Sequence, residues 1–421
     1  MIEEKIILRK LLEIYHRRPS FVYGKETNRR VLLRFNNQEF PDYDYNDADV
    51  KNRYNEAVKN LKRQNLISVE WHSEYDEGVL VKAIWLNIID GAVLPKVYEI
   101  AEIEPLSDKI SLILELIKEG QSSCEVEWVN CFLKEAYDSL SAKKKLIDFW
   151  KNEISTIKDV LRTFSFLPKQ GEEITERAFS LKCFKDSKYF ERYIEKYIIL
   201  IAKKYEPTIK EWLAAGEELG DREILAQIGI VKRNEIYEFC GDIQFSLSDK
   251  ICDFSGFTKG AAISSTAVDD ITAICFNNIE RILFIENKTN YEEYIKKYRK
   301  DRELVIYHGG FYSPQKAKFF SLIEKGRDEN QTSCMFWADI DLGGFLMFDR
   351  LKRLLPDLQP YKMSVHDYNH YKDFGLKHSE IYFKKLAVIK DETKFSMFLE
   401  VIELILFNER TIEQEIMLND L

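Results

Sequence analysis

The sequence predicts an α/β protein whose C-terminal domain is built on a Rossmann-like parallel sheet. Two apolar runs that begin at Arg281 and Ser333 are rich in β-branched and aromatic residues, which is typical of buried parallel strands. Amphipathic segments at residues 291–299 and 313–325 lie between these runs and predict connecting helices. Helical periodicity prevails farther upstream. Together these observations predict three domains, at residues 1–100, 101–222 and 223–421.

The composition is that of an ordinary globular protein, with 421 residues, 45% hydrophobic and 32% charged. No uncharged apolar run is long enough to cross a membrane, and the acidic start Met-Ile-Glu-Glu-Lys does not resemble a signal peptide, so we expect cytoplasmic residence and no membrane association. The seven cysteines are dispersed and form no Cys-x-x-Cys pair, which indicates reduced thiols rather than a structural zinc site.

The first domain has the order of elements found in winged-helix domains. A helix is predicted over residues 3–17, ended by Pro19, and a second over residues 49–64, capped by Asp47 or Asp49. Two strands follow, at residues 66–72 and 79–88, and the polar stretch between them predicts a hairpin turn. The apolar face of the second helix is formed by Val50, Tyr54, Ala57, Val58 and Leu61.

The exposed face of that second helix is basic, although the whole chain carries a net charge of −9. Residues 1–65 hold fourteen Lys and Arg against ten Asp and Glu, a local charge of +4. Two interpretations remain open, because a local basic surface binds phosphate but also occurs on ordinary solvated helices of protein-docking modules. Glu74, Asp76 and Glu77 at the expected hairpin tip would repel phosphate. The candidate DNA contacts are Lys51, Arg53, Lys59, Lys62 and Arg63.

Acidic residues follow two of the predicted parallel strands. Glu286 comes at the end of the first strand, and Asp339 and Asp341 at the end of a later one. Ligands of open α/β sheets bind beyond the carboxyl ends of the strands, so these three side chains are expected to converge. Strand alternation places Asp339 and Asp341 on the same side. An oxygen-only set of this kind suits Mg²⁺ or Mn²⁺.

Each acid also has a simpler interpretation. Asp341 is placed to cap a helix that begins near Leu342, Asp339 to accept a hydrogen bond from a loop, and Glu286 to pair with Lys288 at the surface. An isolated Asp-x-Asp is common in proteins, so the motif alone does not establish a metal site.

The order of these residues along the chain favours the metal site over the simpler roles of the three acids. A strand-end glutamate, a long gap and an Asp-x-Asp resemble the Toprim domain of topoisomerases, primases and some nucleases. The segments Ile285-Glu-Asn-Lys288, Tyr307-His-Gly-Gly-Phe311 and Trp337-Ala-Asp-Ile-Asp-Leu-Gly-Gly-Phe345 resemble the JetD family, as does Arg410-Thr-Ile-Glu-Gln-Glu415. JetD is the nuclease subunit of the Wadjet anti-plasmid defence systems, with a Toprim domain similar to that of the topoisomerase VI A subunit. The resemblance is strongest from Glu217 onward.

The resemblance implies a metal-dependent endodeoxyribonuclease that hydrolyses phosphodiester bonds of circular duplex DNA. Glu286, Asp339 and Asp341 would then be both the catalytic residues and the ligands of one or two Mg²⁺ or Mn²⁺ ions. It also implies a homodimer and partners: an SMC-like ATPase, a kleisin and an accessory subunit. No phosphate-binding loop of the Walker type occurs in the sequence, so the energy for DNA handling would come from the partners.

Neighbouring residues are secondary candidates for contacts with DNA. Lys288 follows the strand-end glutamate and is expected to bind or orient phosphate. His308 is either a phosphate donor or a structural histidine. Gly309 and Gly310 either permit a close backbone approach to a ligand or form only a tight turn.

Two further functional hypotheses remain. A topoisomerase VI-like tyrosine transesterase would need a nucleophilic tyrosine, and Tyr23, Tyr43 and Tyr45 lie in no family-like sequence. A non-catalytic DNA-binding or assembly subunit would retain the fold without needing the three acids. Elsewhere in the last domain the patterns predict a loop at residues 256–265, a helix at 268–276, a strand at 380–390 and a helix at 393–407.

Overall fold

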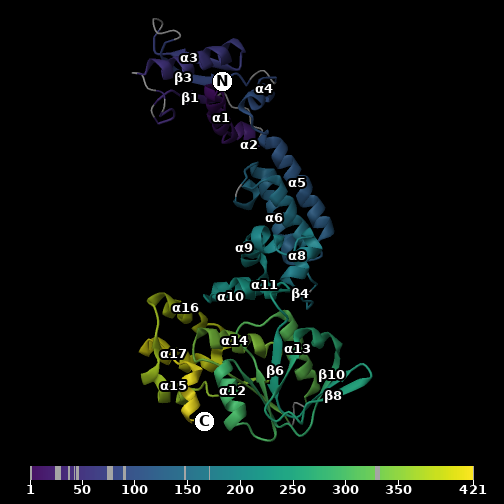
Figure 1. Cartoon of the computed structure of the whole chain (residues 1–421). Helices are drawn as coiled ribbons and strands as arrows, with labels where there is room; N and C mark the ends of the chain where they lie inside the picture. Colours follow the sequence, from purple (N-terminus) through teal and green to yellow (C-terminus); the bar gives the residue numbers. More distant parts are fainter. Residues whose placement is uncertain are drawn as a thin grey trace. The chain divides into compact units, whose positions relative to one another are not determined.

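The computed structural model describes residues 2–23, 30–36, 38–41, 43, 47–73, 79–88, 92–146, 148–169, 171–327 and 332–420 (Figure 1). The chain forms two compact units: Met1–Glu125 with Asn130–Leu161, and Val126–Val129 with Arg162–Leu421. The division into three domains at residues 100 and 222 stays a prediction.

The first unit begins with the predicted helices and hairpin strands. Its elements are α1 (Ile2–His16), α2 (Pro19–Tyr23), β1 (Leu32–Arg34), α3 (Ala48–Arg63), β2 (Ile67–Trp71), β3 (Val81–Leu86) and α4 (Val93–Ala101). Pro19 ends the first helix as expected but also begins α2, because proline fits the first turn of a helix. Strand β1 was not predicted. It completes an antiparallel sheet of order β1-β3-β2.

Helix α3 packs as its apolar pattern predicts. The Asp47 carboxylate caps it by accepting hydrogen bonds from the N–H groups of Asp49 and Val50. Tyr54, with Ala57, Val58 and Leu61, is buried in the core of this part of the unit. The assignment to the winged-helix class stays a prediction, and the expected hairpin tip with Glu74, Asp76 and Glu77 lies outside the described residues.

The predicted helical region is confirmed. It comprises α5 (Leu106–Ser123), α6 (Glu127–Lys143), α7 (Ile154–Phe164), α8 (Glu176–Phe184), α9 (Glu195–Tyr205), α10 (Pro207–Ala215) and α11 (Asp221–Gln227), with shorter helical turns at Asp148–Lys151 (η2) and Phe190–Ile194 (η3). The boundary between the two units falls within α6 and within α7. No helix in the described part of the chain has both the length and the apolar character to cross a membrane.

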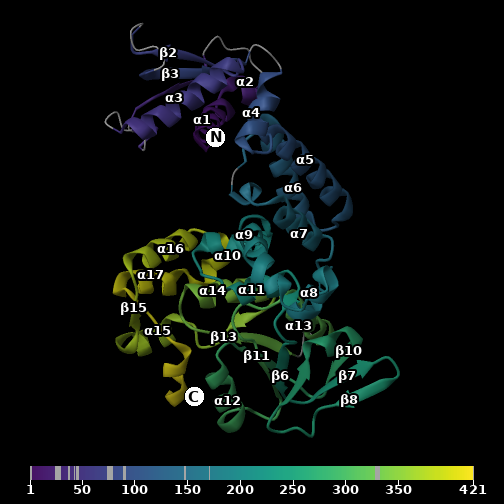
Figure 2. The same ribbon diagram turned by 45° about the horizontal axis from the view of Figure 1, so that its top comes forward.

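A six-stranded mixed sheet organises the second unit (Figure 2). Its order is β14-β13-β11-β12-β6-β9, in which β14, β13, β11 and β12 run parallel and β6 and β9 are antiparallel additions. The parallel part confirms the expected alternation of strands and helices. The strands are β6 (Ile236–Cys240), β9 (Ala261–Ser264), β11 (Arg281–Ile285), β12 (Glu303–Tyr307), β13 (Ser333–Trp337) and β14 (Gln359–Pro360).

Both faces of the parallel strands are covered, which explains their continuous apolar sequences. Helix α12 (Lys288–Lys297) covers one face, where Tyr294 contacts Trp337 of β13. Helices α13 (Pro314–Gly326) and α14 (Leu342–Lys352) cover the other. There Phe320 of α13 contacts Phe284 of β11, and Phe348 of α14 contacts Phe336 of β13.

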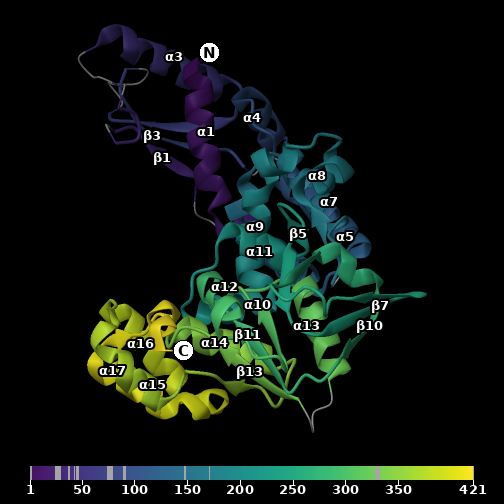
Figure 3. The same ribbon diagram turned by 60° about the horizontal axis from the view of Figure 1, so that its bottom comes forward.

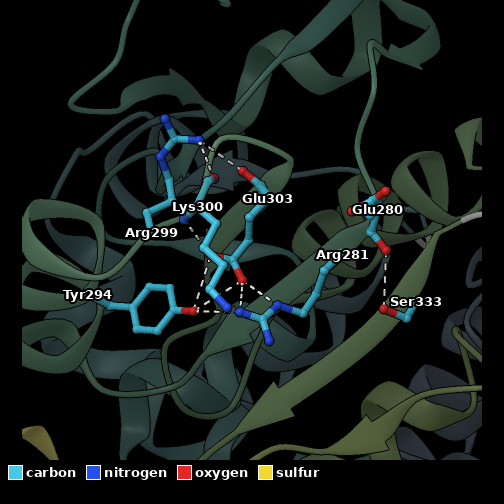
Figure 4. A network of polar contacts seen from close by, with 7 residues as sticks. All are labelled: Glu280, Arg281, Tyr294, Arg299, Lys300, Glu303 and Ser333. Carbon is cyan, nitrogen blue, oxygen red and sulfur yellow. Dashed lines mark hydrogen bonds and ion pairs between the residues drawn. The ribbon is translucent and has the colours of Figure 1, made fainter. Parts of the chain in front are cut away.

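A polar network fixes the amino ends of the central strands (Figure 4). The buried carboxylate of Glu303 binds the Arg281 guanidinium and accepts hydrogen bonds from the Tyr294 hydroxyl at 3.1 Å and the Lys300 N–H at 3.1 Å. Ser333 donates to the Glu280 carbonyl. The amino ends of β11, β12 and β13 are thereby joined, at the edge opposite to the predicted acidic site.

Two predicted element types are wrong. Residues 268–276, expected as a helix, form the end of a short 3₁₀ turn (η4, Ser265–Asp270) and strand β10 (Ile271–Phe276). Strand β10 pairs with β7 (Ile243–Leu247), which also pairs with β8 (Lys250–Asp253). The β-branched residues of this segment therefore serve sheet pairing, which short-range periodicity did not show. The loop predicted at residues 256–265 contains β9 near its end.

Residues 380–390, expected as a strand, form helix α16 (Glu380–Lys390). Ser379 caps it, and Leu386 and Ile389 are buried at helical spacing. The predicted helix at 393–407 is a 3₁₀ turn (η6, Thr393–Phe398) followed by α17 (Leu399–Asn408). These elements gather with α15 (Val365–Tyr371) beside α14 (Figure 3). The remaining elements are β4 (Ile174–Thr175), β5 (Ile230–Val231), η5 (Lys372–Phe374), β15 (Leu376–Lys377), β16 (Arg410–Thr411) and η7 (Gln414–Asp420).

Candidate metal centre

The three predicted acids lie at the carboxyl ends of two adjacent parallel strands. Strands β11 and β13 pair in register, with Ile285 opposite Trp337, and the N–H of Glu286 donates to the Trp337 carbonyl at 2.9 Å. Glu286 therefore directly follows β11, beside the segment that carries Asp339 and Asp341. Strand β13 ends at Trp337, so the two aspartates lie just beyond it, on either side of Ile340, which forms a bridge to Ile412.

Backbone groups anchor one oxygen of each aspartate. Asp339 Oδ1 accepts a hydrogen bond from the N–H of Gln414 at 2.6 Å. Asp341 Oδ1 accepts one from the N–H of Gly344 at 2.7 Å and so caps α14. As the simpler interpretations predicted, Asp341 caps a helix and Asp339 accepts a hydrogen bond from the backbone. Neither hydrogen bond uses the second oxygen of its carboxylate. Gly344 must be glycine, because a Cβ there would stand 2.1 Å from the Asp339 carbonyl oxygen.

One oxygen of the Glu286 carboxylate lacks such a hydrogen bond. This atom, Oε2, is buried and has no hydrogen-bond partner. The predicted surface pairing of Glu286 with Lys288 is wrong, because the Lys288 ammonium pairs with Glu238 and, at 3.5 Å, with Glu292. A buried carboxylate oxygen without a partner costs free energy, so it indicates a position completed by a ligand.

The pKa values of all three carboxyl groups are raised, mainly by burial. Burial, followed by the charges of Asp339 and Asp341, raises the pKa of Glu286 to about 8. Burial and Asp341 raise the pKa of Asp339 to about 7. Burial raises the pKa of Asp341 to about 6, with the Glu217 charge adding to it and the N–H groups of Gly344 and Gly343 opposing it. Without a cation, the site therefore retains protons near neutral pH.

The chemistry of this donor set fits a divalent metal, although the carboxylates are not close enough together to hold an ion. Only carboxylate oxygens gather here, and hard ions such as Mg²⁺ and Mn²⁺ prefer oxygen ligands. Across the described residues, no three His, Cys, Asp or Glu side chains form a group with the geometry of a metal site. Binding an ion would therefore require their free oxygens to move toward one another.

Three further acids surround the site and were not predicted. Glu217, just before α11, lies near Gly343 and Asp341, and its own pKa is raised mainly by burial. Glu413 and Glu415 raise the pKa of Asp339. The only sequence signal for the last two was the family-like segment at residues 410–415, whose position the sequence did not reveal.

Gln414 holds the two strand ends together. The Gln414 side chain is fully buried, its Oε1 accepts from the N–H of Asn287 at 3.0 Å, and its Nε2 donates to the Trp337 carbonyl at 3.1 Å. Its backbone also accepts from the Asn290 side chain and donates to Asp339. One residue thus contacts the ends of both β11 and β13.

The secondary candidates for contacts with DNA do not all lie at the surface. His308 is fully buried between the rings of Tyr312, Phe320 and Phe336, with neither ring nitrogen hydrogen-bonded, and burial holds its pKa well below the ordinary value. Direct contact between His308 and phosphate is incompatible with this burial, and the structural interpretation fits. Gly309 has φ +61°, so the His-Gly-Gly turn requires glycine at that position.

The predicted DNA contacts of the first unit share helix α3. Arg53, Lys62 and Arg63 are exposed and Lys51 is half-buried. Arg53 lies 3.4 Å from Glu3, and Arg63 donates to Asn60 at 3.1 Å. The structure thus leaves both interpretations of this basic face open.

Comparison with known proteins points to one family. Residues 246–421 match the family model described as Wadjet protein JetD, C-terminal, and this stretch contains all three acids and Gln414. Over 418 residues the chain is 26% identical to the Wadjet protein JetD of Bacillus cereus (strain Q1), covering 98% of each chain. The similarity therefore extends through both units.

Proposed function

The chain belongs to the JetD family of Wadjet proteins, and we propose that it is the metal-dependent endonuclease subunit of a Wadjet-type system, cutting duplex DNA with a Toprim-like site. One observation carries this proposal. Glu286, Asp339 and Asp341 lie together beyond two paired parallel strands, and Glu286 Oε2 is buried without a partner. Such a cluster costs stability unless a cation completes it.

Glu286, Asp339 and Asp341 would hold Mg²⁺ or Mn²⁺. A bound ion would neutralise phosphate charge and lower the pKa of a water molecule. The chain's own residues orient the reaction: the N–H groups of Gln414 and Gly344 fix one oxygen of each aspartate and leave the other for the site. Glu286, whose pKa is raised to about 8, is suited to exchange a proton near the leaving oxygen.

Hydrolysis by water is favoured over attack by a tyrosine. Tyr43 is buried and donates its hydroxyl hydrogen to Asn55. Tyr45 and the side chain of Tyr23 lie outside the described residues. Tyr382 lies near the acids, but its hydroxyl accepts a hydrogen bond from the N–H of Leu342, and burial together with Asp341 raises its pKa far from neutrality. A tyrosine held in this way is a poor nucleophile.

Membership in the family supports the remaining parts of the proposal. The substrate is circular double-stranded DNA, and the partners are an SMC-like ATPase, a kleisin and an accessory subunit of a cytoplasmic complex. A two-fold homodimer would place one site on each DNA strand and produce a double-strand break.

The direct test is plasmid cleavage by the assembled system with Mg²⁺ or Mn²⁺. We expect Glu286→Ala and Asp339→Ala to lower the cleavage rate by at least about 100-fold. Glu280→Ala is the matched control, because Glu280 is an exposed acid just before β11, at the opposite edge of the sheet. Wild-type rates in both site variants would show that the acids are assigned wrongly. Protein that stays attached to DNA after denaturation would favour the tyrosine reaction instead.

A further inference from the structure

Two lysines from opposite faces of the sheet flank one tyrosine ring next to the acidic site. The Lys316 Nζ of α13 lies 5.3 Å from the centre of the Tyr307 ring, and the Lys288 Nζ of α12 lies 4.9 Å from it. Tyr307 is the last residue of β12, which pairs with β11 so that Tyr307 stands opposite Ile285, the residue before Glu286. The Glu286 charge also raises the pKa of Tyr307. Both ammonium groups therefore stand at the edge of the sheet that carries the acids.

The charges of the two lysines are balanced unequally. Lys288 is half-exposed and pairs with Glu238 and Glu292. Lys316 is only 8% exposed, and in the described part of the chain no carboxylate lies within ion-pair distance of its ammonium. The ammonium lies 5.6 Å from the centre of the Tyr237 ring and 5.3 Å from the centre of the Tyr307 ring.

Burial of this ammonium is unfavourable for the protein alone. Desolvation lowers the pKa of Lys316 to about 8, and the Lys288 charge acts in the same direction, while Glu235 and Glu238 oppose it. An ammonium taken out of water without a partner is unfavourable, because it loses its hydration. Such a cost is common at binding sites, where the missing partner is supplied by the ligand.

The adjoining His-Gly-Gly turn packs closely against the ammonium. A Cβ at Gly309 would stand 3.4 Å from the Lys316 Nζ and 3.3 Å from the Tyr307 hydroxyl oxygen, so no side chain intervenes there. Gly310 is exposed, and a Cβ at that position would meet nothing within 4 Å. The turn beside Lys316 thus presents glycine backbone at Gly309 and open space at Gly310.

We propose that Lys316 is a phosphate-positioning residue that, together with Lys288, binds a phosphodiester of the DNA backbone beside the Glu286 site. This inference rests on the proposed function, because it assumes that DNA is the ligand. The phosphate oxygens would supply the acceptors that Lys316 lacks. The Lys288 ammonium, which pairs with Glu238, would donate a further hydrogen bond to the same phosphate. The acids would then act on a strand already fixed in position.

The test uses the full-length chain and a short DNA duplex in EDTA, so that binding is measured without metal and without cleavage. We expect Lys316→Met to weaken binding about tenfold at low salt and to reduce the slope of log affinity against log salt by about 0.9, the value for one phosphate contact. Lys318→Met is the matched control. Lys318 lies on the same helix, is exposed and pairs with Asp269, so its loss should leave both quantities nearly unchanged.

Thermal unfolding separates a binding role from a structural one. Lys316→Met keeps the length of the side chain but removes the buried charge, so we expect an equal or higher melting temperature together with weaker DNA binding. A structural lysine would give the opposite, a lower melting temperature with unchanged binding per folded molecule. Lys288→Met, at a half-exposed position, provides a second variant and should also reduce the salt slope.

The outcomes distinguish this inference from the proposed function. Unchanged affinity and salt slope in Lys316→Met would overturn the positioning role, even if the wild-type protein cuts DNA through Glu286. Cleavage that does not depend on Glu286 would overturn the proposed function, while a Lys316-dependent binding signal would still support the phosphate contact.

Discussion

Asp339 accepts a hydrogen bond from the backbone of Gln414, which lies 75 residues farther along the chain. The same glutamine binds the N–H of Asn287 and the carbonyl of Trp337 through its side chain. The carboxyl ends of β11 and β13, and with them the acids, are therefore held in place by a residue that carries no charge.

Replacing Gln414 by alanine should damage both stability and activity. The change leaves the N–H of Asn287 without its partner and removes one of the two hydrogen bonds that the Trp337 carbonyl accepts, which costs about 2 kcal/mol of unfolding free energy. We also expect the cleavage rate to fall at least about tenfold, because the ends of β11 and β13 lose the side chain that hydrogen-bonds to both. Denaturant unfolding and plasmid cleavage measure the two effects. Gln359→Ala is the control, since Gln359 is exposed and its side chain donates to the nearby Asp357 carbonyl; an equal effect there would contradict the role of Gln414.

Metal-free protein should lose stability as the pH rises from about 5 to 8. The pKa values of Glu286 and Asp339 are raised to about 8 and 7 in the folded state, so the folded protein binds more protons than the unfolded chain in this range. Stability is therefore highest below the unfolded pKa values and falls as the pH passes through the folded ones. Mg²⁺ should accordingly raise the melting temperature more at pH 8 than at pH 5.5.

Glu286→Gln provides the matched control for that pH dependence. It keeps the shape of the side chain and removes the charge, so the metal-free variant should be more stable than wild type at pH 8 and respond less to Mg²⁺. Differential scanning calorimetry in EDTA and in Mg²⁺ measures both. A wild-type protein with the same melting temperature at both pH values, with and without Mg²⁺, would show that the acids are not coupled as the geometry indicates.

His308→Phe should leave DNA cleavage and DNA affinity unchanged. The imidazole makes ring contacts only, and its burial keeps it neutral, so an aromatic ring of similar size replaces it without loss of a hydrogen bond. His308→Ala, in contrast, leaves a cavity and should cost about 3 kcal/mol. Loss of DNA affinity in the phenylalanine variant at unchanged stability would restore His308 as a phosphate contact.

Charge reversal on α3 decides between its two interpretations. If the helix binds DNA, Lys62→Glu combined with Arg63→Glu should reduce the salt slope of DNA binding by about 2, since each phosphate contact accounts for about 0.9. Lys96→Glu, at an exposed position of α4 in the same unit, is the control for net charge. Unchanged DNA binding together with weaker assembly with the partner subunits would favour the protein-docking interpretation.

The acids were predictable because each follows a strong local pattern. An apolar strand followed by a carboxylate can be recognised within about ten residues, and parallel strands bring their carboxyl ends to one edge. Gln414 and Glu415 were not assignable in this way. Both residues are separated from their partner Asn287 by more than a hundred residues, and local sequence periodicity does not predict contacts at such a separation.

The errors have physical causes of the same kind. Ile271–Phe276 has enough apolar residues for either element type, and its pairing with β7 decides for a strand. Histidine beside two glycines at a strand end left a phosphate contact and a structural role open, and the tertiary packing that buries His308 favours the structural role. Lys316 belongs to an amphipathic helix, on which a lysine is usually solvated, and only the fold places it next to the Tyr307 ring.

The bridge between Ile340 and Ile412 has a consequence for biosynthesis. The acidic site is not built from neighbouring segments alone. It also needs the hydrogen bond to Asp339 from Gln414, which lies 75 residues farther along the chain. Contacts of such long sequence separation slow folding, because closing the intervening chain costs entropy. Unfinished or proteolytically shortened chains that stop before Ile412 would consequently lack the bridge to Ile340, and with it the segment that anchors Asp339.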